Sequence, residues 1–290
     1  MENPTGKLSL VFRRKASGKS YLAKQYYKLP LQIMPPHYQD KDGTVFAYML
    51  NPSGGILQHD RLLTEITMDE GSRALVTTPA STKIYKMDDG FAVLENKIEM
   101  RGGSILEYLP ESNVPFAGSK TYQNTEFHLD KGATLISFDM VTPGRVSRGE
   151  VFQYDIYEAK TKIYVDGKLI AYDSARIEPE KMDLTAPGMI ECRGANGTIY
   201  IYRDKMGGET IDAVRAFGRT AQPKDGAKFE AEREGDAGYV KFGATMVMDS
   251  LMVVRLISEH TWALENTMLR IWDIIRRSLL GKPAVRIRKY

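Results

Sequence analysis

The chain has 290 residues, a net charge of +3 and 42% hydrophobic residues, which are ordinary values for a folded globular protein. The nearly balanced charge gives no sign of a nucleic-acid-binding protein. A single cysteine, Cys192, excludes an intrachain disulfide and favours a reducing compartment. The N-terminus lacks an apolar core of signal-peptide length, and no apolar run reaches the roughly 18 residues that cross a bilayer. We therefore expect a cytoplasmic protein without membrane or nucleic-acid partners.

The first motif along the chain, Ala16-Ser17-Gly18-Lys19-Ser20, is similar to part of a phosphate-binding loop. That loop needs a glycine where this chain has Arg13, and it needs a helix to follow. The segment that follows is rich in tyrosine and broken by Pro30, which is typical of extended chain. We predict a turn between two strands and no nucleotide binding.

From Thr44 onward, short apolar runs alternate with turns that contain glycine next to aspartate or asparagine, a pattern typical of β-sheets. A turn glycine, a small residue and a strand recur at Gly71, Gly103 and Gly132, spaced by 32 and 29 residues. This spacing predicts stacked supersecondary units, although hairpins also resemble one another by chance. We predict one mainly β domain over residues 1–290, built from large stacked or β-helical sheets, antiparallel and mixed, with two helices.

The two helices are predicted late in the chain. The first spans Glu209 to Phe217 and is closed by Gly218. Residues 224–236 are polar and predict an exposed connection. The second, longer helix spans about Glu259 to Leu280 and is stopped by Gly281 and Pro283. Its apolar residues fall on one face at helical spacing, which predicts burial of Leu264, Met268, Ile271, Trp272, Ile275 and Leu279.

The stretch from Pro52 to Tyr85 is dense in small, hydroxyl and charged residues and predicts a polar wall built on a sheet. Within it, His59 is followed directly by an acidic residue, Asp60. The chain has no Cys-x-x-Cys and no His-x-x-x-His, so a tight structural metal site is not expected. Two interpretations stay open for this pair: a solvated charged turn, or a weak site through which a metal ion passes.

Paired carboxylates offer a different interpretation. Glu107 and Glu111 flank Leu109-Pro110, and Asp139 and Glu150 flank a segment that contains Arg145. Such pairs could perform general acid–base catalysis, as in glycoside hydrolysis, which makes a carbohydrate-active hydrolase using Glu107 and Glu111 the alternative function. No Gly-x-Ser-x-Gly motif is present to supply a nucleophile.

Several motifs in order along nearly the whole chain resemble the UreD family of urease accessory proteins. Two of them are Ser53-Gly54-Gly55-Ile56-Leu57 with Asp60-Arg61-Leu62, and the run from Ala74 to Tyr85 that contains Thr77-Thr78-Pro79-Ala80-Ser81-Thr82-Lys83. The others are Leu106 to Glu111 with Phe116, Gly132-Ala133, Gly144-Arg145, Arg148-Gly149-Glu150 and the end of the C-terminal helix at Leu280-Gly281-Lys282-Pro283.

The resemblance implies a large β structure with two helices and no enzymatic activity. It implies docking on the structural subunits of apo-urease and binding of UreF, which recruits the GTPase UreG, in a dimeric assembly formed through UreF. It also implies a polar channel that conducts nickel to the urease active site, so a nickel ion would be transient cargo, with no tightly bound cofactor.

We predict a set of channel or partner-contact residues from the resemblance: Asp60, Lys83, Tyr85, Glu111, Asp139, Arg145 and Glu150. A weak transient nickel site is predicted at His59 and Asp60. The segment around His59 and Asp60 departs from the family pattern. The family usually has Gly-Gly where this chain has Gln58-His59. Glycine adopts a positive φ freely whereas these residues strain there, so either the turn differs locally or the side chains have a role.

Overall fold

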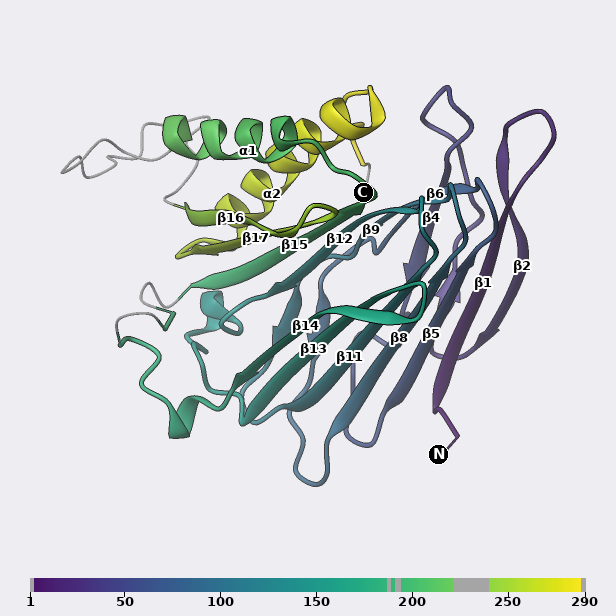
Figure 1. The fold of residues 1–290 in the computed structure, drawn as a ribbon. Helices are drawn as coiled ribbons and strands as arrows, with labels where there is room; N and C mark the ends of the chain where they lie inside the picture. Colours follow the sequence, from purple (N-terminus) through teal and green to yellow (C-terminus); the bar gives the residue numbers. More distant parts are fainter. Residues whose placement is uncertain (1–2, 187–188, 191–193, 222–239, 288–290) are drawn as a thin grey trace.

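The computed structural model describes residues 3–186, 189–190, 194–221 and 240–287. It consists of two stacked β-sheets with helices on one side (Figure 1). Cys192 and the connection expected over residues 224–236 lie outside the described residues. Within those residues, no helix has the length and the apolar character needed to cross a membrane.

The first sheet has seven strands in the order β14-β13-β11-β8-β5-β1-β2, and its five central strands are parallel. In β5 the buried positions alternate with half-buried ones, so one face of this sheet packs inward and the other meets solvent. The bounds are β1 Gly6–Arg14, β2 Ser20–Lys28, β5 Arg61–Met68, β8 Ala92–Met100, β11 Lys120–Leu129, β13 Ile156–Val165 and β14 Lys168–Ile177.

The second sheet has the order β16-β17-β15-β12-β9-β6-β4-β3, and its central strands are covered on both faces, whereas the edge strand β16 is exposed on one. Ala74 and Val76 of β6 pack toward the first sheet, and Leu75 packs toward the helices, which explains the unbroken apolar run in this strand. The bounds are β3 Gln32–Ile33, β4 Val45–Leu50, β6 Arg73–Thr77, β9 Ile105–Leu109, β12 Thr134–Val141, β15 Ala195–Arg203, β16 Val240–Met248 and β17 Leu251–Ser258, with the short β7 Thr82–Ile84 and β10 Asn113–Pro115 pairing beside them.

Three consecutive coils each give one strand to each sheet: β5 with β6, β8 with β9, and β11 with β12. Their turns stack on one another, with the Gly71 N–H donating to the Gly102 carbonyl at 3.1 Å. Gly71, Gly103 and Gly132 all have positive φ. The prediction of stacked sheets from the turn spacing is therefore confirmed, and residues 16–19 form a turn between β1 and β2 as expected.

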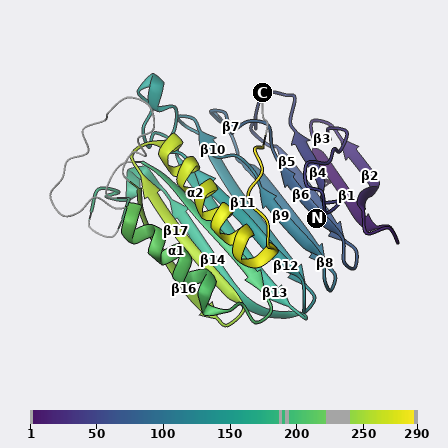
Figure 2. The same ribbon diagram turned by 90° about the horizontal axis from the view of Figure 1, so that it is seen from above.

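Helix α1 (Gly208–Ala221) and helix α2 (Thr261–Ile275) lie on the outer face of the second sheet (Figure 2). The prediction that Gly218 ends the first helix is wrong, because α1 continues to Ala221. A Cβ at Gly218 would lie 2.8 Å from the Phe242 ring, so this glycine allows the helix to pack closely on β16. A wide turn (Arg276–Leu280) follows α2 and ends at Gly281, whose φ is 66°. The predicted apolar face is buried at Leu264, Met268, Ile271, Trp272 and Ile275, whereas Leu279 lies in the turn after α2 and is half-buried.

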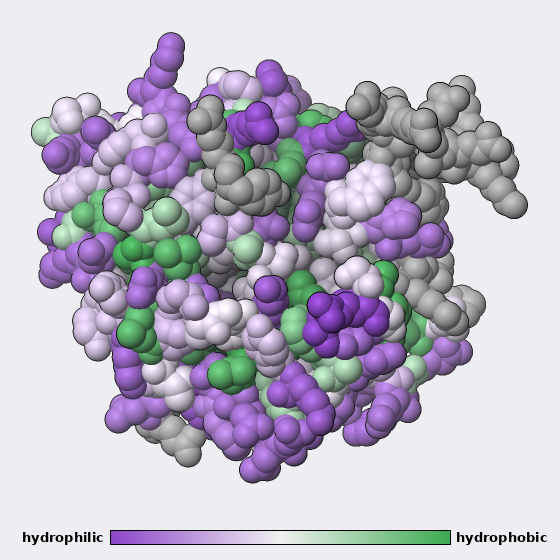
Figure 3. Space-filling model, turned by 180° about the vertical axis from the view of Figure 1, so that it is seen from behind, coloured by the Kyte–Doolittle hydropathy of each residue, from purple (hydrophilic) through white to green (hydrophobic). Residues whose placement is uncertain are grey.

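Two short 3-10 helices, Val146–Arg148 and Pro179–Lys181, lie in the remaining connections. The surface seen from behind is mostly hydrophilic, and hydrophobic residues on that face form small separated patches (Figure 3).

Candidate functional site

A cavity of about 370 Å³ lies between the two sheets. Loops from three successive coils form its rim: residues 51–55, 78–83 and 110–111. The rim therefore contains most of the Ser53-Gly54-Gly55 motif and the Thr78-to-Lys83 motif. The sheets supply the interior lining, which includes Thr64, Asn96, Tyr108, Asn113, Gln123, Thr125, Ser137, Asp139, Thr161 and Tyr200 together with apolar side chains.

The rim is held together by close backbone approach and by hydroxyl groups. A Cβ at Gly55 would lie 2.5 Å from the Lys83 carbonyl oxygen and 2.6 Å from the Tyr85 ring, so only glycine fits there. The Glu111 N–H donates to the Thr78 hydroxyl at 2.9 Å. These contacts explain why small and hydroxyl residues recur in the two motifs, since each coil must approach the next closely.

Asp139 is the acidic side chain in the interior of the cavity. Its carboxylate accepts a hydrogen bond from Gln123 Nε2 at 3.4 Å. Burial raises the pKa of Asp139 to about 6, and the Gln123 hydrogen bond opposes the shift. Asp173 adds to the rise in pKa from a distance. Asp139 is thus a carboxylate with few donors, facing a polar cavity.

Replacing Asp139 by asparagine should stabilise the protein at neutral pH. The carboxyl pKa rises on folding from 3.8 to about 6, so the native state binds more protons between these values and stability falls as pH rises through that window. The loss is at most about 3 kcal/mol, and less where water in the cavity solvates the carboxylate. Denaturation curves of Asp139→Asn and the unaltered protein should differ most above pH 7 and converge near pH 4. A difference that is independent of pH would contradict this.

Two other predicted site residues, Lys83 and Glu111, also border the cavity, both at its rim. The remaining ones lie outside the cavity lining. Arg145 forms an ion pair with Glu150 through two hydrogen bonds, one of them from Nε to Oε2 at 2.8 Å. Arg145 also lies 4.0 Å from the Phe116 ring centroid, and Phe116 packs edge-on against Tyr85. This cluster therefore supports the rim from outside.

Asp60 and His59 lie on an exposed turn. The Leu57 N–H donates to the Asp60 carboxylate at 2.8 Å, so Asp60 closes the turn. His59 has a φ of 64°, the conformation that glycine adopts most easily, and its Nε2 lies 3.8 Å from an Asp89 carboxylate oxygen. Gln58 Oε1 accepts the Asp88 N–H at 3.2 Å, so the side chains of Gln58 and His59 both contact the loop that contains Asp88 and Asp89. No three His, Cys, Asp or Glu side chains within the described ranges are grouped to hold a metal ion.

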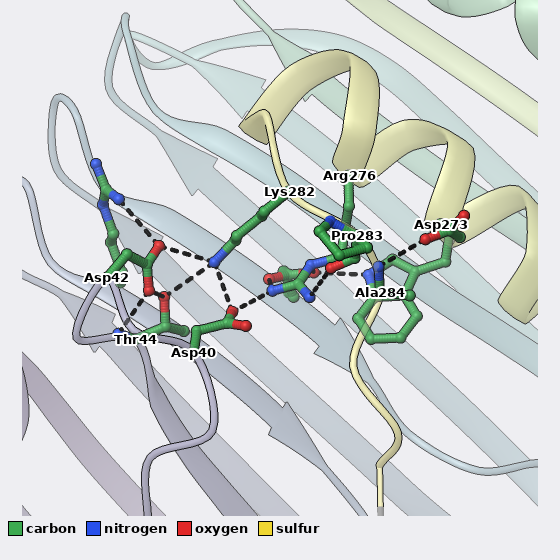
Figure 4. Close-up of polar contacts among 11 residues, drawn as sticks. Asp40, Asp42, Thr44, Asp273, Arg276, Lys282, Pro283 and Ala284 are labelled. Atoms are coloured by element: carbon green, nitrogen blue, oxygen red, sulfur yellow. Dashed lines mark hydrogen bonds and ion pairs between the residues drawn. The ribbon is translucent and has the colours of Figure 1, made fainter.

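Glu107 lies on the opposite face of the second sheet, beneath helix α2. Trp272 Nε1 donates to it at 2.6 Å, and Arg276 Nη2 donates at 3.1 Å. Burial raises the Glu107 pKa, and these two donors oppose the rise. Arg276 also bonds Asp40, and Lys282 bonds both Asp40 and Asp42 (Figure 4).

The alternative of a hydrolase using Glu107 and Glu111 is wrong for this structure. Glu111 borders the cavity, whereas the Glu107 carboxylate is enclosed by Trp272 and Arg276 on the helix side. The two carboxylates do not share a cleft in which a glycosidic bond could lie between them. Asp139 and Glu150 are likewise apart, because one is inside the cavity and the other pairs with Arg145.

Sequence reasoning missed several polar side chains of the cavity, among them Asn113, Gln123 and Tyr200. Asn113 donates to the Tyr157 hydroxyl at 2.8 Å and to Gln123 at 2.9 Å, which forms a polar network next to Asp139. A signal existed for Gln123, because it lies two residues from both Thr121 and Thr125 and therefore shares their inward face of β11.

The coils, the covering helices and the enclosed cavity define a two-sheet β protein with a polar-lined internal space. Comparison with known families is more specific: the model of the UreD urease accessory protein family matches residues 4–289. The chain belongs to this family. It is 30% identical over 288 residues to the urease accessory protein UreD of Bacillus sp. (strain TB-90), with 99% of each chain covered.

Other relatives agree. The UreD protein of Lachnoclostridium phytofermentans is 32% identical over 282 residues, with 97% of this chain and 96% of the relative covered. The UreD protein of Cenarchaeum symbiosum (strain A) is 33% identical over 227 residues, with 77% of this chain and 79% of the relative covered.

Proposed function

We propose that this protein acts in urease maturation by docking on apo-urease and passing nickel ions to it through the inter-sheet cavity. The observation that carries the proposal is the position of the two family motifs. Both lie on the rim of one cavity, which leads inward to Asp139. Family membership supports the urease connection, and the cavity gives the motifs a common physical purpose.

The lining suits an ion in transit. Hydroxyl, amide and carboxylate oxygens hold a divalent cation more loosely than thiolates or a cluster of imidazoles would. Asp139 supplies negative charge inside the cavity, and Glu111 supplies it at the rim, where Lys83 also lies. Nickel is cargo in this proposal, and the protein itself catalyses no reaction.

The proposed partners are the urease structural subunits, UreF, and UreG through UreF, in a cytoplasmic assembly that is dimeric through UreF. Helix α2 supports a UreF contact nearby. Its inner face is buried against the second sheet, while Trp262 and Leu269 on its outer side are 48% and 40% exposed. Exposed large apolar side chains on one helix are typical of a protein-binding surface.

Co-expression of Asp139→Asn with the urease subunits and UreF tests the cavity route. We expect the variant to fold and to be recovered with urease and UreF, while the nickel content and activity of urease fall at least severalfold. Asp130→Asn is the matched control, because Asp130 lies on an exposed turn outside the cavity lining and should have no effect.

Full nickel loading with Asp139→Asn would exclude Asp139 from the route, and failure to recover urease or UreF with the unaltered protein would contradict the docking step.

Nickel binding to the isolated protein, compared with nickel binding to the His59→Ala variant, tests the exposed turn separately. An assembly module without a metal role would bind no nickel in either form.

A further inference from the structure

The N-terminal strands carry an unusual charge. Residues 3–39 contain seven lysine and arginine residues and no aspartate or glutamate, so this segment is more positive than the whole chain, whose net charge is +3. The segment forms β1, β2 and the short β3. Its charge is therefore concentrated at one end of the two sheets.

Elsewhere the solvent face of the first sheet is balanced. Glu65, Lys97, Glu126 and Lys162 occupy one row across four neighbouring strands, with alternating sign. Lys162 Nζ lies 3.0 Å from the Glu126 carboxylate. The row ends at β1, where Lys7 still pairs with Glu65 at 3.0 Å.

In the strand order β5-β1-β2, the last acidic side chain of that face is Glu65 on β5, and β2 lies on the far side of β1 from it. Lys24 and Lys28 are on the same side of the strand, with Tyr26 between them, because side chains alternate along a strand. Lys28 Nζ donates to the Pro4 carbonyl at 2.7 Å. For Lys24 and Lys28, no ion pair is found with any carboxylate of the described residues. Tyr26 and Tyr27 are 57% and 48% exposed.

β2 is also an edge strand. It pairs with β1 alone, and from Lys24 to Lys28 the register with β1 is regular. Neither helix covers it, since both lie toward the other end of the molecule (Figures 1 and 2). An edge strand of nine residues leaves backbone N–H and C=O groups directed outward, where another extended chain can pair with them.

We propose that the β2 edge binds an acidic, extended segment of a partner protein, which adds to the first sheet as an eighth strand. Backbone pairing would supply the alignment, and carboxylates four residues apart would meet Lys24 and Lys28, with an apolar side chain between them against Tyr26. A second copy of this chain is disfavoured because its own β2 is equally positive. Nucleic acid could match the charge but has no peptide groups to pair with the edge.

The probe is a fluorescein-labelled nonapeptide with glutamate at positions three and seven, valine at position five and threonine elsewhere. Fluorescence anisotropy should show binding that weakens as salt increases. Lys24→Glu combined with Lys28→Glu should weaken binding at least tenfold. The matched control combines Lys131→Glu with Lys168→Glu, two exposed lysines remote from β2, one in the turn after β11 and one in β14, and should leave binding unchanged.

Two comparisons separate strand addition from simple charge attraction. The same peptide with alternate amides N-methylated should lose binding, and hydrogen exchange of residues 24–28 should slow when the unmodified peptide is added. Equal binding of the methylated peptide, tighter binding of an oligothymidine of equal charge, or no binding of the acidic peptide to the unaltered protein would each overturn the proposal. The measurement involves neither nickel nor urease, so its result is independent of the cavity route.

Discussion

Arg276→Ala should lower the free energy of unfolding by about 3–5 kcal/mol, because removing one partner of a buried ion pair leaves uncompensated charge. The Arg276 side chain is fully buried and lies between two carboxylates, those of Glu107 and Asp40. It also donates to the Pro283 carbonyl at 2.7 Å, so it fixes the chain that follows α2. Urea denaturation monitored by circular dichroism would measure the loss.

The neighbouring residue gives a matched control. Arg277 pairs with Asp273 at 2.8 Å, but its side chain is 62% exposed, so Arg277→Ala should cost less than about 1 kcal/mol. The deficit of Arg276→Ala should shrink in acid, because protonation of Glu107 removes the buried charge. Equal losses for the two arginine variants would show that the buried cluster contributes no more than a surface pair. Glu107→Gln with Arg276→Met should recover much of the stability, since neither charge is then left alone.

This cluster marks the limit of what the sequence could predict. Glu107 is separated from Trp272 by 165 residues and from Arg276 by 169, and no local pattern connects them. Sequence reasoning therefore treated Glu107 as a candidate catalytic acid, whereas tertiary packing makes it the anchor of helix α2. Alternation along β9 places Glu107 and Tyr108 on opposite faces, but only the stacking of the sheets shows which face meets the helix.

The repeated elements were predictable because their signals are local. Turn glycines about 30 residues apart predicted the repeated coils, and the 3.6-residue periodicity of apolar residues predicted the buried face of α2. The extent of α1 was not predictable from local signals, because Gly218 is required by its contact with Phe242, which lies on a strand more than twenty residues later. The cavity was partly predictable: its rim comes from the polar stretch of residues 52–85, while its interior depends on how the two sheets face each other.

Trp272→Ala should cost about 3–5 kcal/mol, the range for deleting a large aromatic side chain from a core. The ring is 1% exposed and packs in the cluster between α2 and the second sheet. Part of the cost comes from the hydrogen bond of Nε1 to Glu107 at 2.6 Å. Trp272→Phe keeps a phenyl ring in the core but removes the N–H donor and the smaller ring of the indole, so it should cost less than Trp272→Ala, about 1–3 kcal/mol. Thermal and urea denaturation would measure the loss in both variants.

The other tryptophan provides the control. Trp262 begins the same helix, but it is 48% exposed, so Trp262→Ala should change stability by no more than about 0.5 kcal/mol. The fluorescence of that variant reports Trp272 alone and should have the short emission wavelength of a buried indole. An unchanged denaturation curve for Trp272→Ala, together with loss of UreF in the co-expression experiment, would assign the ring to a partner interface. We expect instead that Trp272→Ala lowers stability and still allows UreF to be recovered, because the contacts of Trp272 hold α2 on the sheet whose inner face borders the cavity.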